Sequence, residues 1–364
     1  MAESAISNCF NFNAGPAAMP APVLESLQND LVDYRGRGLS VLEMSHRSSD
    51  FAQIAAKAEK DLRTLLAVPP NYSVLFMQGG ASAQFALCVQ NLDVRKKVAY
   101  ANTGYWAQKA MDTGDALTNT VEVASCIAEP CIKIPASEAW LNSDDASFLH
   151  ITDNETIDGI VYHEIPETAV PIVADMSSSI LSQPVDISRY GMLYAGAQKN
   201  IGPAGITVLI VRDDLLERSA DSNLPSVFNY AAMAKAGSML NTPPTFAWYA
   251  AGLVFEWLLE QGGLVAMAAR NAAQAQRIYS EIDEHAIYNN RVHPANRSRM
   301  NIPFSLTNAV LTAKFLEGSL DRNFIGLKGH KSVGGLRASV YNAATDASVD
   351  ALVDYLDTFA RENS

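Results

Sequence analysis

The chain has 364 residues, of which 48% are hydrophobic and 18% charged, and its formal net charge at pH 7 is -12. This composition is typical of a globular protein with a large core, and the acidic balance argues against nucleic acid and anionic membrane surfaces as partners. The cysteines are scattered and form no C-x-x-C pair, so we expect reduced thiols, no metal site and no disulfide framework (Cys9, Cys88, Cys126, Cys131).

The N-terminal part predicts an extended segment followed by helices. Residues 10–16 end in a Gly-Pro turn, and Pro22 stands where a helix would begin. Ser45-His46-Arg47 precedes a segment whose apolar residues, from Phe51 to Leu66, have helical spacing. The first residues are polar, so we expect no signal peptide and a cytoplasmic protein.

From residue 73 to about 211, short apolar runs alternate with helical patterns. This alternation predicts an α/β domain whose mostly parallel sheet is flanked by helices, and ligands bind such sheets beyond the carboxyl ends of the strands. The expected helices begin at Ala81 and Tyr105, and the expected strands are 74–77, 98–101, 159–162, 172–174, 192–195 and 206–211.

The C-terminal part predicts a second, smaller α/β unit. A helix over 245–259 is too short and, because of Glu256, too polar to span a membrane, and Gly262-Gly263 then breaks the chain. We expect a large domain over 18–258 and a small domain formed by 1–17 and 259–364. The small domain would contain helices over 264–282, 311–320 and the last residues, a strand over 300–306 and a β-hairpin over 328–337.

Lys199 is a single lysine at the end of an apolar strand, before a Gly/Pro-rich turn. Burial there would lower the pKa of its ammonium and favour the neutral amine, the form that makes a Schiff base with a carbonyl. An ordinary lysine reaching from a strand end to water is the alternative. Asp175 ends another strand of the same domain, where it could face the same cofactor or merely cap a turn.

Two further segments suit anions. Gln78-Gly79-Gly80-Ala81-Ser82 joins a strand to a helix, and such a helix N-terminus either holds a phosphate or makes an ordinary tight turn. The predicted hairpin carries His330, Lys331 and Arg337, a basic cluster that suits a carboxylate or phosphate unless it is only a solvated face.

Together these segments resemble the phosphoserine aminotransferase family, in the class V aminotransferase group of fold-type I pyridoxal phosphate (PLP) enzymes. The resemblance runs nearly the whole length of the chain. Its most specific blocks are Ser45-His46-Arg47, residues 154–159, residues 194–205, residues 241–249 and Gly334-Gly335 with Arg337-Ala338-Ser339.

The resemblance implies a role for each matching residue. Lys199 would form the Schiff base, Asp175 would pair with the pyridine nitrogen, Trp106 would stack on the ring and Thr156 would lie near its phenolic oxygen. The cofactor phosphate would be held by Ala81, Ser82 and Gln198, and from the other subunit of a homodimer by Asn241 and Thr242. The substrate's anionic groups would be bound by Arg47, His330, Lys331 and Arg337.

The implied reaction interconverts L-glutamate and 3-phosphohydroxypyruvate with 2-oxoglutarate and O-phospho-L-serine, in serine biosynthesis. The phosphorylated hydroxythreonine of vitamin B6 synthesis is a second implied substrate. Two positions depart from part of the family: Ser82 and Lys331 stand where other members have Arg, and Lys is a point charge whereas Arg is a bidentate fork.

Two alternatives belong to other classes. A PLP-dependent lyase such as a desulfurase shares the fold type, but it needs a reactive cysteine on a loop, and none of the cysteines has an evident activating setting. A catalytically silent binding protein would be indicated by the loss of Lys199 or Asp175, and both are present.

Overall fold

The computed structural model describes residues 9–126 and 131–363. Residues 1–8, on which the expectation of no signal peptide rests, lie outside the described residues. The main sheet has seven strands in the order β2-β8-β7-β6-β5-β3-β4. β8 runs antiparallel to both of its neighbours, and the other pairs are parallel. The strands are β2 (Tyr72–Met77), β3 (Lys97–Asn102), β4 (Asn119–Ser125), β5 (Leu149–Thr152), β6 (Ile172–Asp175), β7 (Met192–Gly196) and β8 (Thr207–Arg212).

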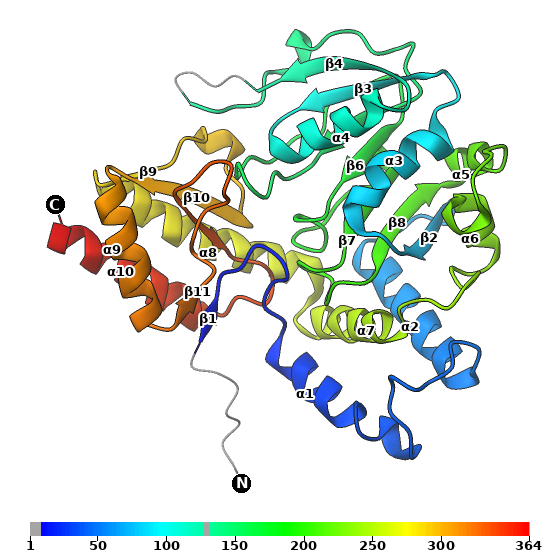
Figure 1. Ribbon diagram of the computed structural model, residues 1–364, viewed down its shortest axis with the longest axis horizontal. Helices are drawn as coiled ribbons and strands as arrows, with labels where there is room; N and C mark the ends of the chain where they lie inside the picture. The colour runs from blue at the N-terminus through cyan, green and yellow to red at the C-terminus, as the bar shows by residue number, and fades with distance from the viewer. Residues whose placement is uncertain (1–8, 127–130, 364) are drawn as a thin grey trace.

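Helices cover both faces of this sheet (Figure 1). One face packs against α1 (Ala21–Asp30), α2 (Ser49–Leu65) and α7 (Thr245–Glu260). The other packs against α3 (Gly80–Leu92), α4 (Tyr105–Asp115), α5 (Asp213–Ser219) and α6 (Tyr230–Lys235). α7 is apolar nearly all round because it is buried, and its Trp248 stacks on Phe76 of β2 with ring centroids 4.3 Å apart. The predicted mostly parallel sheet flanked by helices is therefore confirmed.

The strand predictions at 74–77, 98–101, 172–174, 192–195 and 206–211 are confirmed as β2, β3, β6, β7 and β8. The strand predicted over 159–162 is wrong, since that segment makes only isolated bridges, Ile160 with Arg297 and Val161 with Asn154. Gly159 turns the chain with a φ of +69°, which takes these apolar residues out of the sheet. β4 and β5 were not predicted.

The C-terminal part, yellow to red in Figure 1, forms a smaller α/β unit. Its strands make a three-stranded antiparallel sheet of order β12-β10-β9 and a parallel pair of β1 with β11. The predicted 328–337 hairpin is short, with one antiparallel bridge between Lys328 and Leu336 and flanking backbone hydrogen bonds from Gly329 to Gly335 and from Arg337 to Leu327. β12 also pairs with β10. The elements are β1 (Phe10–Asn11), α8 (Gly263–Glu284), β9 (Tyr288–Asn289), β10 (Asn301–Leu306), α9 (Ala309–Asp321), β11 (Phe324–Ile325), β12 (Leu336–Ser339) and α10 (Asp346–Asn363).

Separate hydrophobic cores distinguish the two parts of the chain. The cores on the two faces of the large sheet draw on residues 23–267, whereas the third combines Phe12 with residues 275–360. α8 begins in the first set and ends in the third. On this basis we propose the division into 18–258 and 1–17 with 259–364. No helix in the described part of the chain combines the length and apolar composition needed to cross a membrane.

Candidate active site

A cavity of about 320 Å³ opens at the carboxyl edge of the large sheet, where the small unit meets it. The segments at the ends of β2, β3, β5, β6 and β7 line it, together with Ala14-Gly15 near the N-terminus and two side chains from the C-terminal part of the chain. Most of the predicted site residues lie in its wall, namely Ala81, Ser82, Trp106, Thr156, Asp175, Gln198, Lys199, His330 and Arg337.

Lys199 follows the end of β7, and its Nζ donates a hydrogen bond to Thr156 Oγ1 at 2.6 Å. Loss of water around the amine lowers its pKa from 10.5 to about 8, and the charge of Arg337 acts in the same direction. Asp175 and Glu155 oppose this effect, but burial outweighs them. The neutral amine required for nucleophilic attack is therefore accessible near neutral pH.

Asp175 is the last residue of β6 and is buried. Its Oδ1 accepts a hydrogen bond from the backbone N–H of Ser177 at 2.8 Å. Burial raises the pKa of this carboxyl, while Ser177 and the charge of Lys199 act to lower it. A cationic group in the cavity would therefore find a buried carboxylate as its partner.

The glycine loop presents the beginning of α3 to the cavity. Gly79 has a φ of +99°, and a Cβ at this position would lie 2.6 Å from Ala83 Cβ, so the turn needs glycine. α3 then begins at Gly80 without a side-chain cap. Its first backbone N–H groups are therefore available to an anion beside Ala81 and Ser82.

The beginning of α4 carries Trp106 and is fixed by an acidic residue that the sequence analysis missed. Glu155 is fully buried, and its two carboxylate oxygens accept hydrogen bonds from the backbone N–H groups of Trp106 at 2.9 Å and Ala107 at 2.7 Å. Asp158 accepts from the N–H of Tyr105 at 2.9 Å. Burial, and then the charge of Asp158, raise the pKa of Glu155 to about 8, although the N–H groups of Trp106 and Ala107 act to lower it. The oxygens of the two acidic side chains satisfy the free N–H groups of α4 and so position the indole at the cavity.

Arg337 lies on β12 and reaches the cavity from the small unit. Its Nη1 donates to the backbone carbonyl of Thr156 at 3.2 Å, and its buried Nε has no hydrogen-bond partner among the described residues. His330 is also in the cavity wall, and its Nδ1 lies 2.7 Å from Ser332 Oγ. An unpaired guanidinium N–H next to a hollow is suited to a carboxylate or phosphate oxygen.

The remaining predicted residues lie elsewhere in the described chain. Arg47, Asn241, Thr242 and Lys331 are exposed, and none of them lines the cavity. The single chain therefore does not bring them to Lys199.

A larger hollow, of about 920 Å³, is a separate feature of the surface. Trp140, Asp153 and Arg189 are among its lining residues, and none of the predicted site residues is. The larger volume favours this hollow as the active site, but the presence of Lys199 and its partners identifies the smaller cavity instead.

The cysteines are not candidates for the nucleophile. Burial raises the pKa of the Cys88 and Cys126 thiols to about 12, so both are poor nucleophiles, and the described cavity wall contains no cysteine.

Comparisons with known proteins agree with this geometry. The family described as "Aminotransferase class-V" matches residues 9–352. A phosphoserine aminotransferase of Acinetobacter baylyi is 50% identical over 359 residues, 97% of this chain and 99% of that protein.

Solved structures give the same result. A phosphoserine aminotransferase from Bacillus circulans subsp. alkalophilus is 43% identical, with a TM-score of 0.94 over 98% of this chain and 99% of that one. A PLP-bound phosphoserine aminotransferase from Trichomonas vaginalis is 41% identical, with a TM-score of 0.92 over 96% of this chain and 99% of that one.

The chain is thus a class V aminotransferase with the fold-type I architecture. Within that class it belongs to the phosphoserine aminotransferase family, as the resemblance in the sequence indicated.

Proposed function

We propose that this protein uses PLP to transfer an amino group between L-glutamate and 3-phosphohydroxypyruvate, yielding 2-oxoglutarate and O-phospho-L-serine, in serine biosynthesis. The observation that carries the proposal is the amine of Lys199, with its lowered pKa, in one cavity with Asp175 and Arg337. Nothing in the described cavity wall favours the lyase alternative, which would require a reactive cysteine there.

The residues present fit PLP. The uncapped beginning of α3, with Ala81, Ser82 and Gln198, would hold the phosphate. Asp175 would pair with the pyridine nitrogen, and Trp106 and Thr156 would contact the ring. When bound, PLP supplies an electron sink that stabilises negative charge at the substrate Cα.

Lys199 would act as the proton carrier of the reaction. As a neutral amine it would take the proton from the substrate Cα in one half-reaction, and as the ammonium it would give a proton to the Cα of the other substrate in the reverse half-reaction; a pKa of about 8 allows both near neutral pH. The hydroxyl of Thr156, which accepts from Nζ, orients the amine inside the cavity.

Arg337 would bind the α-carboxylate that both amino acids share, through the Nε that has no partner among the described residues. Of the other basic candidates, His330 lines the cavity, whereas Arg47 and Lys331 do not line the cavity of the single chain. One or more of His330, Lys331 and Arg47 would accept the γ-carboxylate of glutamate and the phosphate of phosphoserine in turn. The phosphorylated hydroxythreonine is a further substrate to test, since it carries the same anions.

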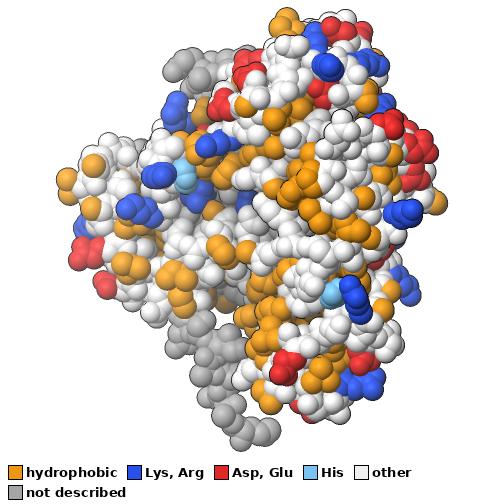
Figure 2. All heavy atoms as spheres, turned by 45° about the vertical axis from the view of Figure 1, so that its right-hand side comes forward, with side chains coloured by type: hydrophobic (Ala, Val, Ile, Leu, Met, Phe, Trp, Pro, Cys, Tyr) orange, Lys and Arg blue, Asp and Glu red, His pale blue; other side chains and the backbone are white. Residues whose placement is uncertain are grey.

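We also propose a homodimer, in which Asn241 and Thr242 reach the phosphate site of the partner subunit. Both are exposed and lie outside their own cavity, as the proposal requires. Exposed apolar side chains on and around α1 and beside the 241–242 loop supply contact area, namely Leu24, Leu31, Val32, Leu42 and Leu240. In Figure 2 the centre of the face turned to the viewer is mostly orange and white, with most charged side chains toward its margins. The free cysteines support a cytoplasmic location.

The function can be tested by adding L-glutamate and O-phospho-L-serine separately to the PLP-loaded protein, without any keto acid. Loss of the lysine-bound cofactor absorbance with both amino acids is the expected result. A response to glutamate alone would preserve the aminotransferase assignment and contradict the phosphoserine assignment. No response to either would contradict both.

A further inference from the structure

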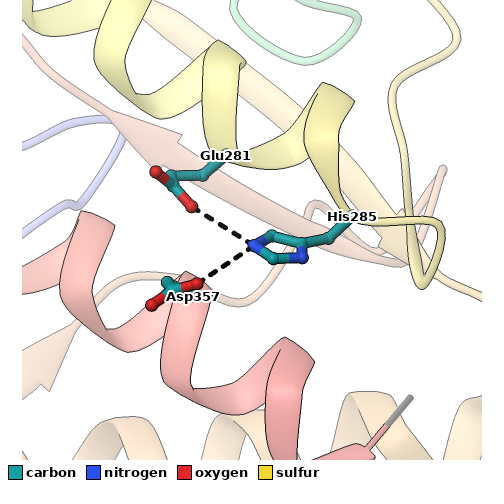
Figure 3. A group of neighbouring side chains, drawn as sticks. All are labelled: Glu281, His285 and Asp357. Atoms are coloured by element: carbon teal, nitrogen blue, oxygen red, sulfur yellow. Dashed lines mark ion pairs between the residues drawn. The ribbon is translucent and has the colours of Figure 1, made fainter.

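Three potential metal-binding side chains meet in the small unit, apart from the residues of the cavity wall (Figure 3). Glu281 lies in the last turns of α8, His285 follows the end of that helix, and Asp357 projects from α10. Glu281 and His285 are four residues apart, and their side chains meet beside the end of the helix. One ligand atom from each residue can be chosen so that all three lie within 4.8 Å of one another.

The imidazole of His285 contacts both carboxylates from the same nitrogen. Its Nε2 lies 3.4 Å from Glu281 Oε2 and 3.3 Å from Asp357 Oδ1. Both distances exceed the length of a charge-assisted N–H···O bond, about 2.7–2.9 Å, so one N–H shared between the two oxygens would bond only weakly to each. The Nε2 atom is buried and has no hydrogen-bond partner among the described residues. Long, shared contacts of this kind leave the His285 nitrogen weakly satisfied.

A metal ion at the centre of the three groups accounts for this arrangement better. Zinc binds histidine nitrogen and carboxylate oxygen at about 2.0–2.2 Å, so tetrahedral ligands lie about 3.4 Å from one another. The distances from His285 Nε2 to Glu281 Oε2, 3.4 Å, and to Asp357 Oδ1, 3.3 Å, match this ligand-to-ligand distance. The three ligand atoms lie within 4.8 Å of one another, so the third distance, between the carboxylates, would shorten when the ion binds.

One neighbouring cation competes for the same oxygen. Arg361 Nε lies 2.9 Å from Asp357 Oδ1, but the Arg361 side chain is 76% exposed. Exposed ion pairs of this kind contribute little free energy, so an ion of charge two can displace the guanidinium.

Although the cysteine pattern gave no reason to expect a metal site, we propose that Glu281, His285 and Asp357 form a binding site for a divalent transition metal, which zinc fits best. Two carboxylates balance the charge of the ion, the neutral imidazole supplies the third ligand, and water would complete the tetrahedron. The bound ion would join the end of α8 to α10 and so hold together two helices of the small unit.

The test is calorimetric titration of Zn²⁺ into the PLP-loaded protein, prepared without a histidine tag. The wild type should bind one zinc ion per chain that His285→Ala does not bind. Glu281→Gln and Asp357→Asn should each lower the affinity at least tenfold, since even the loss of an outer partner of a metal ligand costs about 10–100-fold. Glu284→Gln and Asp354→Asn, which alter exposed acids on the same helices, are the matched controls and should bind as the wild type does.

A second readout separates metal ligation from unspecific binding. Co²⁺ in a tetrahedral site with nitrogen and oxygen ligands should give a visible absorption band in the wild type that His285→Ala lacks. Equal zinc affinity in the wild type, the three ligand variants and the two controls would overturn the proposal. A wild type that takes up no zinc would overturn it as well. Circular dichroism of each variant confirms that α8 and α10 remain folded.

Discussion

The lowered pKa of Lys199 makes a prediction that can be tested on the protein without PLP. An amine of ordinary pKa, 10.5, is neutral to roughly 0.03% at pH 7, whereas an amine of pKa about 8 is neutral to roughly 9%. Only the neutral amine attacks the PLP aldehyde. The rate at which Lys199 captures PLP should therefore rise about tenfold per pH unit below pH 8 and level off above it.

Asp175→Asn perturbs this titration in a defined direction. Among the charges that raise the pKa of Lys199, Asp175 is the largest, so its removal should lower that pKa below about 8 and move the plateau to lower pH. The assay is the rate of growth of the lysine-bound cofactor absorbance after PLP is added, measured from about pH 6 to about pH 10. The midpoint of the profile is compared, because the variant will also bind PLP more weakly.

Matched variants make the experiment decisive. Lys235→Ala, which alters an exposed lysine on α6, should leave the profile unchanged, and Lys199→Ala should give no such absorbance. A wild-type rate that continues to rise tenfold per unit up to about pH 10 would mean that Lys199 titrates as an ordinary lysine. An upward shift of the midpoint in Asp175→Asn would refute the assigned electrostatics.

Three further changes follow from the geometry. In steady-state kinetics, Arg337→Ala should raise KM at least about tenfold for both L-glutamate and O-phospho-L-serine, because a hydrogen bond to a charged group contributes about 1.5–3 kcal/mol. An effect on the phosphorylated substrate alone would mean that Arg337 binds a different anion. Glu155→Gln leaves one acceptor oxygen for the N–H groups of Trp106 and Ala107. The affinity for PLP and the visible circular dichroism of the bound cofactor should therefore both change. An unchanged dichroism would rule out a positioning role for Glu155. Gly159→Ala places a Cβ 2.2 Å from Pro303 Cδ at a φ of +69°, so the free energy of unfolding in urea should fall by at least about 1–2 kcal/mol. An unaltered midpoint of urea unfolding would show that the turn accommodates the side chain without strain.

The sequence predicts those parts of the fold that depend on local pattern. β2, β3, β6, β7 and β8 are continuous apolar runs, as expected of strands buried on both faces. β5 contains His150, a buried polar residue whose Nε2 shares a hydrogen bond of 2.8 Å with the hydroxyl of Tyr194. β4 is a partly exposed edge strand. Neither strand is therefore a continuous apolar run. The strand predicted over 159–162 fails for the opposite reason, because Ile160 and Val161 are buried apolar residues that do not belong to a strand.

The candidate site shows the same division. Lys199 and Asp175 could be predicted to meet because both end strands of one parallel sheet, whose carboxyl edge gathers them. Glu155 could not be assigned in this way, since its partners are 49 and 48 residues away and no local pattern links them. Arg47, Asn241 and Thr242 came only from the resemblance, and none of them lines the cavity of the described chain.

The most direct test of the central claim is turnover of L-glutamate and 3-phosphohydroxypyruvate by Lys199→Ala beside Lys235→Ala. Lys199→Ala should bind PLP without forming the lysine-bound absorbance and should lose transamination, while Lys235→Ala should match the wild type. Near-normal turnover by Lys199→Ala would contradict the account, because the proton at the substrate Cα would then be moved by another group.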